Sequence, residues 1–117
     1  MGLIDEISGR KVYFDTNIFI YLLEGFDAAE RQIQQIREVL LTGSCEVHTS
    51  ELTLCELLVL PYRNGASETI KTYRRFLEES GAVSLIPTVR DTYLRSSYYR
   101  GHFGLKMPDA IHVASAE

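Results

Sequence analysis

One short segment near the start of the chain does most to limit the possible folds. The β-branched and aromatic residues 12–14 stop at Asp15. Thr16 and Asn17 follow, and residues 18–23 are then apolar without a break. This pattern predicts a buried strand, a turn and a helix. Asp15 would then lie at the carboxyl end of a strand, where α/β proteins bind ligands. The structural alternative is a helix N-cap, a role that Thr16 or Asn17 could share.

The rest of the chain repeats this alternation of strand and helix signals. Two further strands are expected, at 45–48 and 83–86. Further helices are expected over residues 27–42, 51–60, 67–80, 88–99 and 108–117. Their boundaries rest on Asp27 and Thr88 as N-caps and on Pro61, Gly81, Gly101 and Gly104 as helix breakers. Strands that alternate with helices predict an α/β fold with a parallel sheet.

Length and charge limit the class of protein. A chain of 117 residues with a net charge of −4 fits one compact domain and is poorly suited to simple electrostatic adhesion to nucleic acid. Cys45 and Cys55 form no C-x-x-C pair, which disfavours structural zinc. No apolar run approaches the roughly 20 residues that span a bilayer, so we expect a cytoplasmic protein with no membrane partner.

Glu56 is the second acidic residue whose position is informative. Within residues 52–60 only Thr53 and Glu56 are polar, so Glu56 lies on a helix otherwise built for burial. A buried carboxylate must be hydrogen-bonded, paired, metal-bound or protonated. Two structural alternatives remain open: a capping box formed by residues 53–56, and a narrow solvated stripe along the helix.

Asp109 is the third acidic candidate, in the first turn of the last helix and directly after Pro108. The helix dipole also favours an acid there, so a structural role explains this residue equally well. His112 lies one turn further along on the same face. It could ligate a metal, although a lone histidine is more often packed or hydrogen-bonded.

Within three residues of the three acids, the sequence has only one lysine or arginine, Lys106 before Asp109. If Asp15, Glu56 and Asp109 converge, their carboxylates repel one another unless a cation lies between them. Ligands that are all oxygen favour Mg²⁺ or Mn²⁺ over zinc. Such a site suits hydrolysis of phosphodiesters, because the metal polarises a phosphoryl oxygen and stabilises the leaving oxygen.

Residues 90–103 are the best candidate for holding a nucleic-acid backbone. Arg90, Arg95 and Arg100 interleave there with aromatic side chains. Basic groups hold phosphates, and aromatic faces stack on unpaired bases, which indicates contact with RNA. The structural alternative is an ordinary amphipathic helix whose tyrosines pack inward.

Three segments carry a family resemblance: VYFDTN at 12–17, TSELTLCEL at 49–57 and MPDAIHVASA at 107–116. Together they resemble the PIN-domain ribonucleases, and most closely the VapC toxins of toxin–antitoxin pairs. The resemblance covers essentially the whole chain in order and spacing. It implies a Rossmann-like three-layer fold, Mg²⁺- or Mn²⁺-dependent endonucleolytic cleavage of RNA, a homodimer, and inhibition by a VapB-like antitoxin.

By the same match, Asp15, Glu56 and Asp109 would be the catalytic, metal-holding acids, and Asn17 would support the site from its turn. One departure concerns the end of the sequence. Members of this family continue into another strand that carries a further acid, and then into a final strand. The resemblance therefore implies a single domain over 1–117 that is short at its C-terminus and lacks the last one or two strands, unless another subunit completes the sheet.

Two other functions are compatible with the sequence. A catalytically weak module would keep an RNA- or antitoxin-binding surface and lose turnover together with the fourth acid. A phosphatase with Asp15 as its nucleophile would need a second acid two residues further on, where this chain has Asn17. That replacement disfavours the phosphatase.

Overall fold

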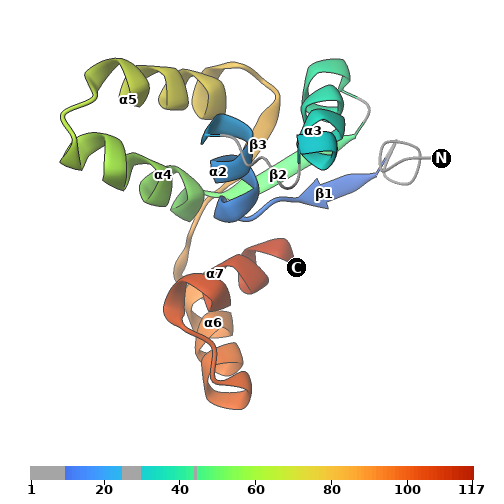
Figure 1. Ribbon diagram of the computed structural model, residues 1–117. Coiled ribbons are helices and arrows are strands. Elements are labelled where there is room, and N and C mark those ends of the chain that lie inside the picture. The colour runs from blue at the N-terminus through green and yellow to red at the C-terminus, as the bar shows by residue number, and fades with distance from the viewer. Residues whose placement is uncertain (1–9, 25–29, 44) are drawn as a thin grey trace.

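The computed structural model describes residues 10–24, 30–43 and 45–117, and it has an α/β fold built on a parallel sheet (Figure 1). Its three strands are β1 (Lys11–Tyr13), β2 (Glu46–Ser50) and β3 (Val83–Ile86). The helices within the described ranges are α2 (Thr16–Glu24), α3 (Glu30–Thr42), α4 (Glu51–Arg63), α5 (Ser67–Arg74), α6 (Arg90–Phe103) and α7 (Met107–Ala116). A π-helical turn, η2 (Arg75–Glu79), continues α5. The expected α/β class with parallel strands is confirmed.

The sheet has the order β1-β2-β3, and both pairs of neighbouring strands are parallel. Val12 lies opposite Val47, which in turn lies opposite Val83. Because the strands are parallel, their carboxyl ends meet at one edge of the sheet. At that edge the buried hydroxyl of Thr49 donates a hydrogen bond to the carbonyl of Phe14, at 2.6 Å. This bond ties the end of β1 to the end of β2.

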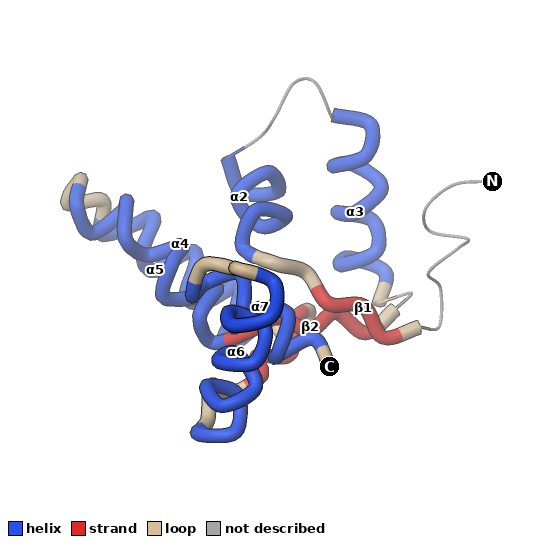
Figure 2. The backbone as a smooth tube through the Cα atoms, turned by 90° about the horizontal axis from the view of Figure 1, so that it is seen from below, coloured by secondary structure: helices blue, strands red, loops and turns tan. Residues whose placement is uncertain are grey.

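Helices cover both faces of the sheet. Helices α2, α3, α4 and α5 lie on one side, and α6 and α7 lie together on the other, as two views at right angles show (Figures 1 and 2). The pair formed by α6 and α7 reaches the rest of the protein mainly through contacts of α7 with β2 and α4. The result is a three-layer arrangement in which α7 faces the sheet from the side opposite to α2.

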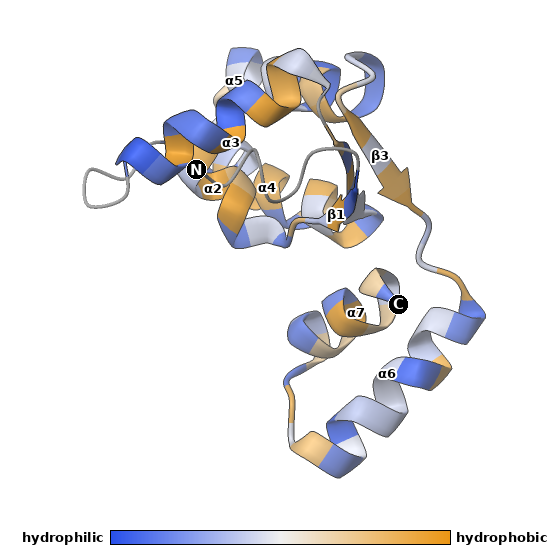
Figure 3. Ribbon diagram, turned by 90° about the vertical axis from the view of Figure 1, so that its right-hand side faces the viewer, coloured by the Kyte–Doolittle hydropathy of each residue, from blue (hydrophilic) through white to orange (hydrophobic). Residues whose placement is uncertain are grey.

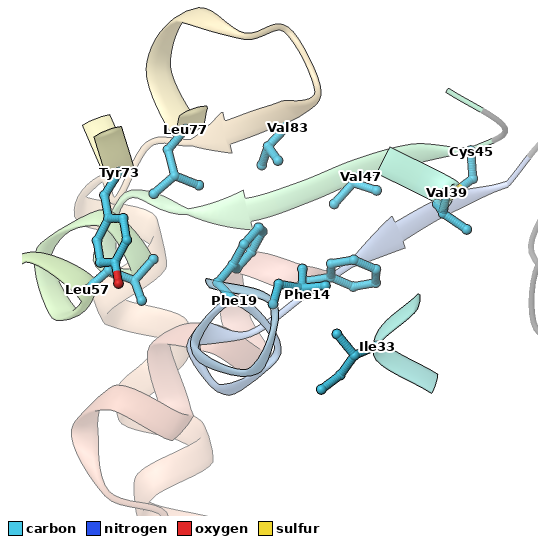
Figure 4. Close-up of a cluster of buried hydrophobic side chains, with 11 residues drawn as sticks. Phe14, Phe19, Ile33, Val39, Cys45, Val47, Leu57, Tyr73, Leu77 and Val83 are labelled. Carbon is cyan, nitrogen blue, oxygen red and sulfur yellow. The ribbon is translucent and has the colours of Figure 1, made fainter. Parts of the chain in front are cut away.

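The main hydrophobic core fills the space between the sheet and the first group of helices (Figure 4). Phe19 is fully buried at its centre, with its ring edge-on to Phe14 at 6.0 Å and to Phe76 at 6.3 Å between centroids. The opposite face is covered differently, because α7 buries the small side chains of Ala110 and Ala114. Small side chains let the backbone of α7 lie close to the layer beneath it.

Pro61 does not end its helix, contrary to the expected stop after residue 60, because α4 continues to Arg63. A proline removes only its own N–H from the helical pattern. The carbonyls of the last turn find donors beyond it: Asn64 N–H bonds to Leu60, and Ala66 N–H bonds to Pro61. The final turn therefore forms although one intrahelical bond is missing.

The helix expected over residues 88–99 is also longer than expected. Helix α6 passes through Gly101 and ends at Gly104, where φ is 68°. A glycine inside a helix costs only about 1 kcal/mol relative to alanine, which the packing of α6 on α7 outweighs. Val89 takes the N-cap position in place of Thr88. The other expected cap, Asp27, lies outside the described residues.

None of the described helices has the length and hydrophobicity needed to cross a bilayer.

Tyr73 should make the free energy of unfolding depend on pH in the alkaline range. Burial, followed by the nearby charge of Glu24, raises the pKa of the Tyr73 phenol above its ordinary value of 10.0. Ionisation therefore favours the unfolded chain, and the free energy of unfolding falls as the pH rises from the ordinary value through the raised one. We expect Tyr73→Phe to remove part of this loss while changing stability at pH 7 little. Urea unfolding at pH 7 and at about pH 10 to 11 measures the difference, and equal pH sensitivity of the two proteins would contradict the prediction.

Candidate active site

Asp15 lies between β1 and α2, at the carboxyl edge of the sheet. Its side chain is exposed, and Oδ1 accepts a long hydrogen bond of 3.3 Å from the N–H of Ile18. Asp15 therefore does cap α2, as the structural alternative required. The cap uses one oxygen, and Oδ2 forms no hydrogen bond within the described residues. Asn17, two residues further on, is exposed in the first turn of α2. Its side-chain amide forms no hydrogen bond within the described residues.

Glu56 lies near the middle of α4, in a partly buried position with a third of its side chain exposed. Its Oε1 accepts a hydrogen bond from the hydroxyl of Thr16 at 2.6 Å and lies 3.0 Å from Nε2 of His112. The capping-box alternative for residues 53–56 is wrong, because α4 begins two residues earlier and Ser50 caps it. Glu56 is held by residues of α2 and α7 instead.

His112 lies on α7 with 11% of its side chain exposed. Its Nδ1 lies 2.6 Å from the hydroxyl of Tyr13, and its Nε2 faces both Glu56 and Thr16. Burial is the main cause of a raised pKa for the Tyr13 phenol. Tyr13 therefore remains protonated at neutral pH and keeps a hydrogen available for donation.

Buried threonines extend this network inward. Thr53 is fully buried beneath Glu56, with its hydroxyl 2.6 Å from that of Thr49 and 3.4 Å from that of Thr16. The sequence indicated only strand or cap roles for Tyr13, Thr16 and Thr53. It did not place them in the site. The available signal was Thr53 itself, which precedes Glu56 by three residues on an otherwise apolar helix and so shares its face.

Asp109 is exposed in the first turn of α7, directly after Pro108. It lies one turn before His112, on the same face of that helix, as the spacing predicted. Asp109 therefore reaches the site from the layer opposite to α2, through the packing of α7 on β2 and α4.

A single cleft of about 310 Å³ joins the predicted residues. Its walls are formed by Asp15, Thr16, Asn17, Ile20, Glu56, Pro108, Asp109 and His112. All three predicted acids and the supporting asparagine are thus brought to one place, and no lysine or arginine lies among the lining residues. Hard oxygen ligands of this kind suit a hydrated Mg²⁺ or Mn²⁺, which keeps several waters and binds through one or two carboxylates. No group of three His, Cys, Asp or Glu side chains in the described ranges is already gathered for direct coordination of a metal.

The three arginines expected to contact RNA differ in their surroundings on α6. Arg95 is held within the protein, where it donates to Asp91 at 2.9 Å and to the carbonyl of Ala114 at 2.6 Å. Arg100 donates at 3.3 Å to the carbonyl of Leu105. Arg90 is exposed and has no side-chain hydrogen bond within the described residues. Arg90 is therefore the arginine of this set that is free to bind an external phosphate.

Two of the three tyrosines of α6 do not pack inward as the structural alternative required, while the third, Tyr99, is half-buried. Tyr93 is 50% exposed and Tyr98 is 55% exposed, and Phe103 is more exposed still. Tyr98 lies against His102 with ring centroids 4.2 Å apart. Figure 3 shows α6 and α7 side by side, below the rest of the protein in that view. The exposure of Tyr93, Tyr98 and Phe103 shows that these rings meet solvent.

The structure is thus a parallel α/β domain whose carboxyl edge presents acids from three separate elements. Residues 12–117 match the PIN domain, and the chain belongs to the PIN-domain family. This is a family of nucleases, which are typically metal-dependent. Comparison with curated proteins found no match.

Proposed function

We propose that this PIN domain is a metal-dependent endoribonuclease that acts as the toxin of a toxin–antitoxin pair, in the manner of VapC proteins. The observation that carries the proposal is the meeting of Asp15, Glu56 and Asp109 in one cleft. These acids come from the end of β1, from α4 and from α7. Carboxylates collected in this way without a lysine or arginine favour a bound divalent cation.

In this proposal the three carboxylates hold Mg²⁺ or Mn²⁺. When bound, the cation supplies polarisation of a phosphoryl oxygen and activation of water. The chain itself fixes Glu56: Thr16 donates to its Oε1, which leaves Oε2 without a hydrogen-bond partner in the described part of the chain. The exposed amide of Asn17 adds a neutral donor beside the acids, suited to a phosphate oxygen or an ordered water.

RNA would approach over α6. The free guanidinium of Arg90 supplies a phosphate contact, and the exposed rings of Tyr98 and Phe103 supply surfaces on which unpaired bases can stack. Arg95 and Arg100 are weaker candidates, because each would first give up hydrogen bonds within the protein. The net charge of −4 makes such local contacts necessary, since the protein as a whole repels a polyanion.

A VapB-like antitoxin and a second copy of the chain are the proposed protein partners, acting in the cytoplasm. Exposed apolar side chains on α4 support an interface of this kind. Val59 and Leu60 are each 49% exposed, and Tyr62 is 62% exposed. Apolar side chains exposed within one turn of a helix can contribute to a site of contact with another protein.

The function is tested by incubating the protein with a structured RNA in the presence of Mn²⁺ or of EDTA. We expect cleavage with Mn²⁺ and none with EDTA, because the proposed chemistry depends on the cation. Cleavage that persists in EDTA would contradict a metal-dependent nuclease. RNA binding without cleavage, with or without Mn²⁺, would instead support the catalytically weak binding module.

The RNA surface is tested separately by Arg90→Ala. We expect weaker RNA binding and a salt dependence reduced by about one phosphate contact, with unchanged cleavage once RNA is saturating. Arg75→Ala, an exposed arginine of η2, is the matched control and should leave both quantities unchanged. A loss of equal size in the two variants would show that general positive charge matters rather than the position of Arg90.

A further inference from the structure

His112 connects the elements that carry the three acids. Through Nδ1 it contacts Tyr13, at the end of β1 and two residues before Asp15. Through Nε2 it contacts Glu56 on α4. His112 itself follows Asp109 by three residues on α7. A single imidazole thus joins the strand and the two helices from which the acids project.

The hydrogen bonds fix which nitrogen donates to Glu56. The Thr16 hydroxyl is committed to Oε1 of Glu56, at 2.6 Å. A carboxylate only accepts hydrogen bonds, so Nε2 must carry a hydrogen, since a bare lone pair there would face a negatively charged oxygen. In the neutral imidazole Nδ1 is then the acceptor, and the Tyr13 hydroxyl, 2.6 Å away, donates to it. Tyr13 therefore stabilises the tautomer that places an N–H against Glu56, because it donates to the nitrogen which that tautomer leaves bare.

We propose that Tyr13 and His112 act as a positioning pair for Glu56, a role that rests on the proposed metal-dependent function of the cleft. The pair and Thr16 hold Oε1, so Oε2 remains available to a cation. Groups that orient metal-binding carboxylates in this way commonly change metal affinity or activity by about 10- to 100-fold when they are removed. Both nitrogens of His112 are already engaged within the protein, which distinguishes this role from direct ligation of the metal.

Two substitutions of His112 separate positioning from simple packing. In His112→Gln the side-chain amide can reach the place of Nε2 and still donate to Glu56. In His112→Asn the shorter amide can reach only the place of Nδ1, beside Tyr13. Both variants keep a polar side chain of similar character, so a structural role alone predicts similar behaviour for the two.

The experiment measures Mn²⁺ affinity by electron paramagnetic resonance on the RNA-free protein. We expect His112→Asn to weaken Mn²⁺ binding by about 10-fold or more, and His112→Gln to stay within a few-fold of the original protein. Tyr13→Phe should weaken binding to a lesser degree, and adding it to His112→Asn should cause little further loss, because the two residues act in series. His102→Asn, an exposed histidine of α6, is the control and should have no effect.

Nitrogen-15 chemical shifts of His112 provide a second measurement that does not depend on metal or activity. We expect a protonated Nε2 and an unprotonated Nδ1 in the original protein, and a shifted Nδ1 resonance in Tyr13→Phe, where that nitrogen loses its hydrogen-bond donor. Equal losses in the Gln and Asn variants, or an unprotonated Nε2, would overturn the positioning pair alone. An original protein that binds no Mn²⁺ would overturn the proposed function and the positioning pair with it.

Discussion

Asp109→Asn is expected to reduce RNA cleavage by about 100-fold or more while the protein stays folded. The substitution keeps the size of the side chain and removes its negative charge. Asp109 is exposed and has no hydrogen bond to another side chain within the described residues, so little native structure depends on the carboxylate. The substitution should therefore weaken cation binding and leave the stability of the fold nearly unchanged. Asp15→Asn should have the same effect, because both acids line the same cleft.

Single-turnover cleavage at several Mn²⁺ concentrations, together with thermal unfolding of each variant, measures these effects. Asp91→Asn is a matched control: Asp91 is also an exposed aspartate in the first turn of a helix, but it pairs with Arg95 away from the cleft. We expect this control to cleave normally. If both cleft variants cleaved RNA at the original rate, the proposed metal site would be wrong.

The sequence was sufficient to predict why Asp15 and Glu56 come together. Residues 12–14 and 45–48 predicted strands, and parallel neighbours bring their carboxyl ends to one edge. Because α4 begins directly after β2, its face near that edge includes Glu56. The alternation of strands and helices therefore predicts that these two acids lie close together, although neither acid indicates this alone.

The position of Asp109 could not be derived in the same way. No strand leads directly into α7, which comes to the cleft by packing Ala110, Ile111 and Ala114 against the layer that contains β2. Such contacts depend on the shape of the assembled sheet, and the local sequence indicates only that this helix has an apolar face. The sequence pattern treated the convergence of Asp109 with the other acids only as a condition, and the resemblance of residues 107–116 to a known family implied it.

The hydrogen-bond network was missed for a related reason. Tyr13 looks like an ordinary strand residue and Thr16 like a helix cap, because both roles are set by nearby residues. Their contacts with His112 join positions separated by 99 and 96 residues. The helix ends were misjudged because Pro61 and Gly101 are local signals for a stop. The last turn of α4 keeps hydrogen bonds beyond Pro61, and α6 packs on α7 through and past Gly101.

Phe19→Ala is expected to lower the free energy of unfolding by about 3 to 5 kcal/mol, which is a large share of the 5 to 15 kcal/mol typical of a small domain. The Phe19 ring is fully buried between Phe14 and Phe76, so its removal loses apolar burial and leaves a cavity.

Urea unfolding measures the loss, and Leu41→Ala is the control, because Leu41 is 86% exposed and its truncation should change stability by less than about 0.5 kcal/mol. Phe19 also lies one turn after Thr16 on α2, yet it does not line the cleft. Cleavage by Phe19→Ala should therefore fall only as far as the folded fraction falls. A larger loss of cleavage in fully folded protein would mean that the core holds Thr16 against Glu56 more directly than their hydrogen bond indicates.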